Sequence, residues 1–98
     1  MPLLAAGWVA KRCQITGKVQ GVWYRAWTIE EAQARGLKGW VRNCADGSVE
    51  ALFAGPQEKV DDMITACHRG PPAARVASIG VEDFAGDIPD GFAKRSGS

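Results

Sequence analysis

The sequence is short of the residues that build metal sites and disulfide frameworks. Its 98 residues include one histidine and three cysteines. The cysteines, Cys13, Cys44 and Cys67, are odd in number and have no Cys-x-x-Cys spacing, a pattern typical of reduced thiols. No group of histidine, cysteine and acidic residues has the spacing of metal ligands. We therefore expect neither a metal nor another cofactor.

An excess of charge and a long apolar run are also absent. Twelve Lys and Arg residues oppose eleven Asp and Glu residues, for a net charge of +1, so the charge balance does not favour a nucleic-acid or membrane partner. No apolar stretch approaches the about 20 residues of a membrane span, and the N-terminal segment lacks the basic residues of a signal peptide. These features predict a cytoplasmic protein, and since nothing indicates an oligomer we expect a monomer.

The composition that is present is that of a globular domain, with 46% hydrophobic and 23% charged residues. A chain of this length can bury a core without disulfides. We expect one domain over residues 1–98, with its core at about residues 8–93. The last residues, 94–98, read KRSGS and are expected to form a loose tail.

Apolar patterns and turn signals divide the chain into strands and helices. They predict strands over residues 8–16, 38–43, 48–54 and 74–84, with a short fifth strand over 91–95. They predict helices over residues 24–35 and from Pro56 to the residue before Gly70. The order β-α-β-β-α-β predicts an α+β, ferredoxin-like sandwich, with two helices on one face of a four- to five-stranded antiparallel sheet. Because this fold serves many functions, the function must come from a site.

The helices also carry predictions about their buried faces. In the first, Trp23, Trp27 and Ala34 share one stripe. In the second, the expected buried stripe follows the spacing i, i+3, i+4 and i+7 and comprises Val60, Met63, Ile64 and Cys67. The four tryptophans of the chain are expected to pack rather than to contact a ligand.

The segment GKVQGVWYR, residues 17–25, joins the first strand to the first helix. Its glycines allow successive backbone N–H groups to turn toward one point, which makes a nest for an anion, and the helix N-terminus adds further donors. Arg25 is unfavourable beside that positive helix end unless an anion binds there, and its planar guanidinium matches two phosphate oxygens. The alternative is a connecting loop whose Arg25 forms a local ion pair.

This segment resembles the first signature of the acylphosphatase family. ITGKVQGVWYR, residues 15–25, is similar to the family's pattern of an apolar residue followed by GxVQGVx[FM]R. Tyr24 departs from that pattern, since the family usually has Phe or Met there. The ring suits the same packing, but the hydroxyl needs a partner of its own.

Two further segments carry the same resemblance. GWVRN at residues 39–43, with Gly47, Val49 and Gly55 after it, resembles the family's second signature, and GPPAARV at 70–76 resembles its later Gly-Pro segment. Together the three segments cover roughly residues 13–81 in the family's order.

The resemblance implies a hydrolase that splits small-molecule acyl phosphates into a carboxylate and inorganic phosphate, with the phosphate as a product inhibitor. It implies that Arg25 holds the phosphate and that Asn43 orients the attacking water. The backbone amides that assist Arg25 would belong to the loop residues Val19, Gln20, Gly21, Val22, Trp23 and Tyr24.

The residue types agree with those implied roles. Asparagine is depleted in strands, and its amide offers both an acceptor and donors for a water; the alternative is that Asn43 simply enters the turn that follows. A carboxylate leaves readily, so phosphoryl transfer needs mainly positioning and charge stabilisation. His68, near the end of the second helix, is expected only to offset the helix dipole.

Two functions of another class remain open on the sequence alone. KGWVRN, residues 38–43, faintly resembles the start of an RNA-binding signature, but it falls on the second strand and the charge is nearly neutral. The other is a non-catalytic regulatory domain that kept the loop. Similar domains also begin much larger carbamoyl-transfer maturation proteins, although the length of this sequence favours the separate enzyme.

Overall fold

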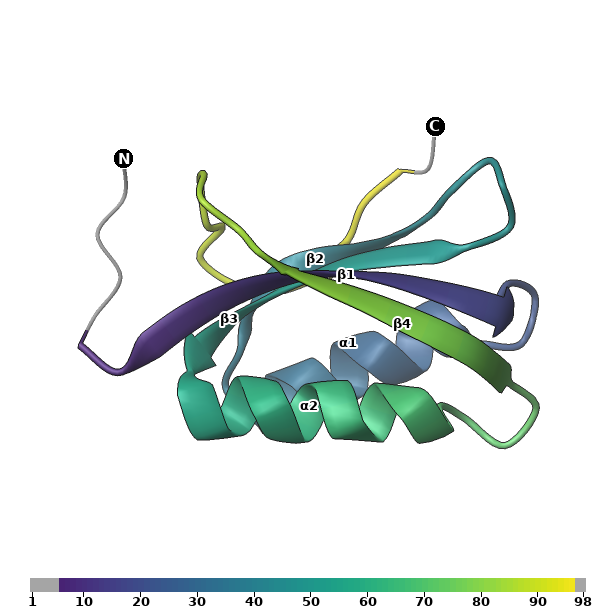
Figure 1. Ribbon diagram of the computed structural model, residues 1–98, viewed down its shortest axis with the longest axis horizontal. Coiled ribbons are helices and arrows are strands. Elements are labelled where there is room, and N and C mark those ends of the chain that lie inside the picture. Colours follow the sequence, from purple (N-terminus) through teal and green to yellow (C-terminus); the bar gives the residue numbers. More distant parts are fainter. Residues whose placement is uncertain (1–5, 97–98) are drawn as a thin grey trace.

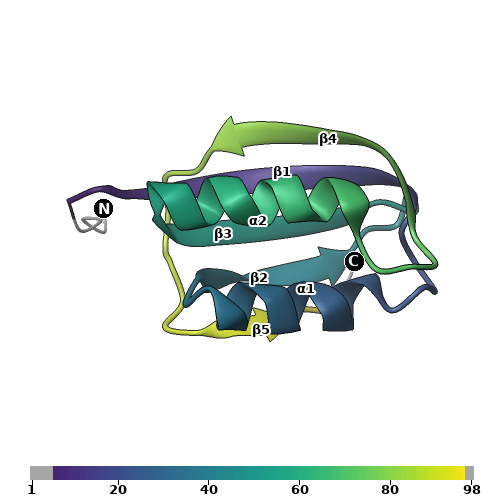
Figure 2. The ribbon, with the colours of Figure 1, turned by 90° about the horizontal axis from the view of Figure 1, so that it is seen from below.

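The computed structural model describes residues 6–96. These form the elements β1 (Trp8–Lys18), α1 (Tyr24–Ala34), β2 (Lys38–Asn43), β3 (Val49–Pro56), α2 (Gln57–Arg69), β4 (Arg75–Asp83) and β5 (Phe92–Lys94). Both helices lie on the same face of one twisted sheet (Figure 1). Viewed from the helix side, α2 lies over β1 and β3, and α1 lies over β2 and β5 (Figure 2).

The five strands have the order β4-β1-β3-β2-β5. β1 pairs antiparallel with β3 and β4, and β2 pairs antiparallel with β3. The predicted α+β, ferredoxin-like fold is therefore confirmed. β5 pairs parallel with β2, so the sheet is mixed where a wholly antiparallel one was expected. The reason is that the chain after β4 crosses to the opposite edge of the sheet and reverses its direction there. β5 therefore runs antiparallel to β4 and parallel to β2.

β1 continues past its expected end at Thr16 to Lys18. The pairing with β4 shifts register between Thr16 and Gly17, and Gly17 has a φ of +121°. A Cβ atom at Gly17 would lie 2.2 Å from the carbonyl oxygen of Arg75, so only glycine allows the strand to continue through this bulge. The bulge carries β1 to the edge where the loop before α1 begins.

The buried face of α1 differs from the predicted stripe of Trp23, Trp27 and Ala34. Its buried residues are Tyr24, Thr28 and Ala32, which follow the spacing i, i+4, i+8. The Thr28 hydroxyl donates to the Tyr24 carbonyl (2.7 Å), and this bond allows a polar residue to be buried. The predicted stripe was wrong because the prediction considered apolar side chains alone. Thr28 is buried although it is polar, since its hydroxyl bonds to the backbone of its own helix.

The second helix follows its prediction closely. α2 begins at Gln57, with Pro56 as its N-cap, and ends at Arg69 before Gly70. Of the expected stripe, Val60, Met63 and Cys67 are buried, and Ile64 is partly buried against the same core. The main core fills the space between the helices and the sheet, and its largest fully buried side chains include Tyr24, Phe53, Ile15 and Met63. Leu52 is buried in a second cluster with Ala10 and Ala54.

The C-terminal segment belongs partly to the sheet. Lys94 is the last residue of β5, and the amide of Arg95 donates to the Val41 carbonyl (2.8 Å). Of the loose tail expected over 94–98, residues 97 and 98 lie outside the described residues. Neither of the helices found in residues 6–96 is long and apolar enough to cross a membrane.

Candidate active site

The loop between β1 and α1 has the backbone geometry of an anion-binding nest. Gly21 has a φ of 72° and Trp23 a φ of 66°, and Val22 between them is not in the positive region. Alternating signs of φ turn successive N–H groups toward one side of the chain. The first hydrogen bond of α1 runs from the Trp27 amide to the Trp23 carbonyl (3.0 Å).

The amides that precede that bond have no acceptor. Within the described part of the chain, no hydrogen bond is donated by the backbone N–H groups from Gln20 to Ala26. α1 has no side-chain N-cap and no acidic residue in its first turn. A set of free donors and an unopposed positive helix end therefore face the same region.

Arg25 lies in that first turn and is partly exposed. None of the carboxylates in residues 6–96 forms an ion pair with it. Within these residues, the local ion pair that the sequence left open as an alternative is therefore not formed. Arg25 adds its charge to a helix end that already favours an anion.

Asn43 is the last residue of β2. It lies two residues after Val41, whose side chain packs in the core on the helix side of the sheet. Because alternate residues of a strand share a face, Asn43 points to that side as well. The Asn43 Oδ1 atom is buried and has no hydrogen-bond partner among the described residues. An unsatisfied buried acceptor is unusual in a folded protein and calls for a bound group that donates to it.

A cavity of about 400 Å³ brings Arg25 and Asn43 together. Its lining consists of Val19, Gly21, Trp23, Tyr24, Arg25, Ala26, Ile29, Asn43 and Lys94. Two cations, Arg25 and Lys94, are in this lining, and no carboxylate is. The cavity is thus mostly apolar, with its polar groups suited to an anion.

Most of the residues that sequence reasoning assigned to the site meet at this cavity. Arg25, Asn43 and four of the six loop residues line it, whereas Gln20 and Val22 do not. Val22 is buried in the core. Sequence reasoning missed Ala26, Ile29 and Lys94. The i, i+4 spacing of Ile29 from Arg25 along α1 could have indicated Ile29, but no signal in the sequence places Ala26 or Lys94.

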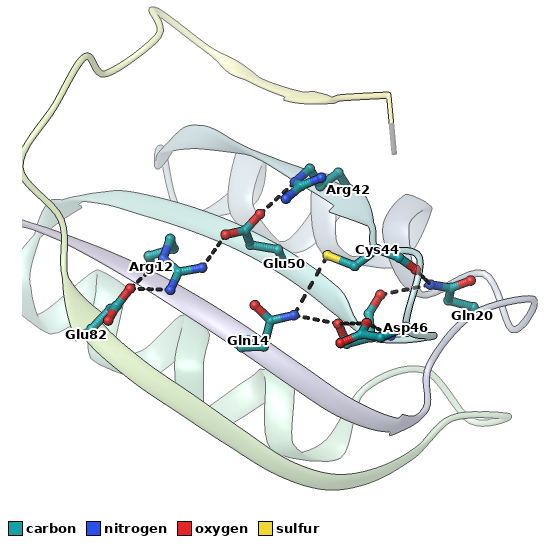
Figure 3. A network of polar contacts seen from close by, with 9 residues as sticks. Arg12, Gln14, Gln20, Arg42, Cys44, Asp46, Glu50 and Glu82 are labelled. Carbon is teal, nitrogen blue, oxygen red and sulfur yellow. Dashed lines mark hydrogen bonds and ion pairs between the residues drawn. The ribbon is translucent and has the colours of Figure 1, made fainter. Parts of the chain in front are cut away.

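Gln20 connects the loop to the turn that follows Asn43. Its Nε2 group donates to the carbonyls of Cys44 and Ser48 (2.8 Å each). From the other side, Gln14 on β1 donates to the Ser48 hydroxyl, and Asp46 accepts from the same hydroxyl (Figure 3). Gln20 thus sets the position of the loop relative to the end of β2, where Asn43 lies.

Tyr24 anchors the start of α1 to the end of α2. Its ring is buried, and its hydroxyl donates to the Cys67 carbonyl (2.7 Å). In a longer helix that carbonyl would accept from the amide four residues on, but residue 71 is Pro71 and has no N–H. Tyr24 therefore supplies the missing donor. The Cys67 carbonyl is thus the partner of the hydroxyl group that Phe or Met would lack at this position.

A chain of ion pairs crosses the opposite face of the sheet. Glu50 on β3 accepts from Arg12 and from Arg42, and Arg12 also pairs with Glu82 on β4 (Figure 3). Burial would raise the pKa of the Glu50 carboxyl, but the hydrogen bonds from the two arginines outweigh it and lower that pKa. These contacts link four strands behind the cavity and involve none of its lining residues.

The three cysteines lie in two kinds of surroundings. Cys13 and Cys67 are buried in the core, and Cys44 is partly exposed in the turn after β2. Burial raises the pKa of the Cys13 and Cys67 thiols to about 12, so both are protonated at neutral pH. No group of three or more potential metal ligands occurs in the portion that the structure describes.

Comparison with known proteins identifies the family of this chain. The family model described as acylphosphatase matches residues 11–94. An acylphosphatase of Rhizorhabdus wittichii is 58% identical over 87 residues, which are 89% of this chain and 88% of the relative.

Solved structures of acylphosphatases have the same fold. The one from Coxiella burnetii superposes with a TM-score of 0.89 at 27% identity, over 97% of this chain and 100% of the other. The one from Bacillus subtilis gives a TM-score of 0.85 at 33% identity, over 89% of this chain and 98% of the other. The chain belongs to the acylphosphatase family, enzymes that hydrolyse the carboxyl–phosphate bond of small-molecule acyl phosphates.

Proposed function

We propose that this acylphosphatase holds the phosphoryl group of its substrate with Arg25 and the amides of loop residues 19–24, and orients the attacking water with Asn43. One observation carries the proposal. Residues with free backbone donors, an arginine without an ion pair and Asn43, whose amide oxygen is unsatisfied, line one cavity in the described part of the chain.

The phosphoryl group would occupy the nest at the N-terminus of α1. The free N–H groups beginning at Gln20 would donate to its equatorial oxygens, and Arg25 would make two parallel bonds to them. The negative charge of the phosphoryl group would then offset both the helix dipole and the Arg25 charge. Holding it in a preformed set of donors lowers the barrier because little reorganisation is needed as charge develops.

The Asn43 Oδ1 atom would accept a hydrogen bond from the water and hold it for attack on phosphorus. The water oxygen forms a bond to phosphorus while the bond from phosphorus to the acyl oxygen breaks. The electron pair of that bond stays on the carboxylate, which needs no proton to leave. The protons of the water remain with inorganic phosphate and solvent, so neither a general acid nor a metal is required.

Three further properties belong to this proposal. Inorganic phosphate, as product, binds the same nest and inhibits competitively. The enzyme acts as a cytoplasmic monomer without a metal. It does not bind nucleic acid or a membrane: the outer face of the sheet carries the ion pairs of Arg12, Glu50 and Arg42, where an RNA-binding sheet would need stacking aromatic rings.

The test is hydrolysis of benzoyl phosphate, followed by its ultraviolet absorbance, in the parent and in Arg25→Ala, with His68→Ala as a control outside the cavity. We expect the parent to remain active after dialysis against a chelator, the control to match it, and Arg25→Ala to lose more than about 100-fold in kcat/KM. Full activity of Arg25→Ala, or recovery of a chelated parent only with Mg²⁺ or Zn²⁺, would refute the proposal.

A further inference from the structure

Trp23 combines two unfavourable features in one residue. Its side chain is 83% exposed, whereas the next large exposed hydrophobic residue in residues 6–96, Val81, is 47% exposed. Its backbone is left-handed, with φ 66° and ψ 20°, a conformation that bulky residues rarely adopt. Strained backbone of this kind persists mainly where function requires it.

The other tryptophans have contacts that explain them. Trp27 packs against the Tyr24 ring, with centroids 5.4 Å apart. Lys38 lies over the ring of Trp8 at 5.8 Å, and Arg95 over that of Trp40 at 4.6 Å. Among the described residues, the Trp23 side chain has no ring contact, no hydrogen bond and no cation over its face. The expectation that all the tryptophans pack is wrong for Trp23.

The position of Trp23 relates this free ring to the substrate. It precedes Arg25 by two residues and lines the cavity that Arg25 and Asn43 share. In an acyl phosphate, one oxygen and the carbonyl carbon separate phosphorus from the acyl substituent. A phosphoryl group in the nest therefore leaves the substituent beside the nest, in the cavity whose lining gains apolar surface from Trp23 and Ile29.

We propose that Trp23 is a specificity-determining residue, whose exposed indole ring stacks on the acyl substituent and favours aromatic acyl phosphates over small aliphatic ones. This rests on the proposed position of the phosphoryl group. Flat aromatic groups gain from offset or edge contacts with an indole beyond the area they bury. An acetyl group offers one methyl and gains little from the same ring.

The experiment compares kcat/KM for benzoyl phosphate and acetyl phosphate in the parent, Trp23→Gly and Trp23→Phe. Trp23→Gly removes the ring and suits the left-handed backbone, so it keeps the loop path. We expect the ratio of the two kcat/KM values to shift roughly tenfold against benzoyl phosphate in Trp23→Gly, and Trp23→Phe to recover part of it. Trp40→Phe, which alters an indole outside the cavity, should keep the parent ratio.

Competitive inhibition by inorganic phosphate separates this proposal from the previous one. An unchanged ratio in Trp23→Gly, with phosphate inhibition retained, would overturn the role of the ring and leave the phosphate site standing. An equal loss for both substrates together with loss of phosphate inhibition would show that Trp23 serves the loop and not the acyl group, and would overturn the proposal as well. Parent activity that phosphate does not inhibit would instead count against the proposed nest.

Discussion

Replacing Gln20 should lower both the stability of the fold and the rate of the reaction. The change Gln20→Ala removes two hydrogen bonds, to the carbonyls of Cys44 and Ser48. Each carbonyl keeps another donor, because the Gly47 amide bonds to that of Cys44 (3.1 Å) and the Cys44 amide to that of Ser48 (2.9 Å). Neither carbonyl is then left unsatisfied, and the loss is the net value of two ordinary bonds.

That value gives the size of the effect. At about 0.5–1.5 kcal/mol per bond, with each carbonyl still partnered, we expect about 1–2 kcal/mol in the free energy of unfolding. For a domain of this size Tm falls about 4–8 °C per kcal/mol, so Gln20→Ala should melt about 4–16 °C lower. The loop and Asn43 also lose their link, and mispositioning of this kind costs on the order of 10²-fold in kcat.

The matched control is Gln14→Ala. Gln14 also donates to Ser48, but through the hydroxyl and from the opposite face of the sheet, so it does not touch the loop. Gln14→Ala also removes two hydrogen bonds, to the Ser48 hydroxyl and to the Cys44 Sγ atom (3.7 Å). We expect it to lower Tm by a comparable amount while kcat for benzoyl phosphate stays within about twofold. Thermal melts and initial rates on both variants decide the matter. Equal kcat values for Gln20→Ala and Gln14→Ala would refute the positioning role.

Three other predictions concern the surroundings of the cavity. Tyr24→Phe leaves the buried Cys67 carbonyl without a donor and should cost about 1–3 kcal/mol of unfolding free energy in a urea titration; unchanged stability would show that another group replaces the hydroxyl. Because burial raises the pKa of the Cys13 and Cys67 thiols from 9.0 to about 12, the folded state keeps protons that the unfolded state loses. The contribution of the thiols to stability should therefore be level below pH about 9 and fall above it by up to about 1.4 kcal/mol per pH unit for each thiol. Cys13→Ala should reduce that slope by one thiol's share, and an equally steep fall in the variant would contradict this origin. Lys94→Gln should weaken inhibition by inorganic phosphate two- to threefold at low salt, by about 0.4–0.7 kcal/mol, and have little effect at 1 M salt, where screening is strong; an effect of equal size at both salts would exclude a long-range charge effect.

Local signals in the sequence predicted most of the elements, and the family's pattern indicated two residues of the proposed site. β2 has the predicted bounds of residues 38–43, because its apolar positions, turn and glycine all agree. Arg25 and Asn43 stand in segments whose pattern resembles a family, and the structure brings both to one cavity. These residues depend on loop and strand-end geometry that nearby residues determine.

The sequence could not predict what depends on distant segments. Lys94 reaches the cavity only because β5 crosses to the far edge and pairs with β2, and nothing near Lys94 encodes that crossing. The exposure of Trp23 was missed because helical spacing places it with Trp27, whereas its left-handed backbone keeps it outside the helix, which begins at the next residue. The partner of the Tyr24 hydroxyl lies on α2 and becomes visible only when the two helices are packed.

Competitive inhibition by inorganic phosphate tests most directly whether Arg25 holds the phosphoryl group and Asn43 guides the water. Inhibition constants and kcat are measured for the parent, Arg25→Lys and Asn43→Ala, with benzoyl phosphate as substrate. Arg25→Lys keeps the charge but cannot make two parallel bonds, so phosphate should bind at least about tenfold more weakly and kcat should fall with it. Asn43→Ala should lose on the order of 10²-fold or more in kcat while its phosphate inhibition constant stays within about twofold of the parent. If Asn43→Ala loses phosphate binding as severely as Arg25→Lys, the two residues do not divide these roles.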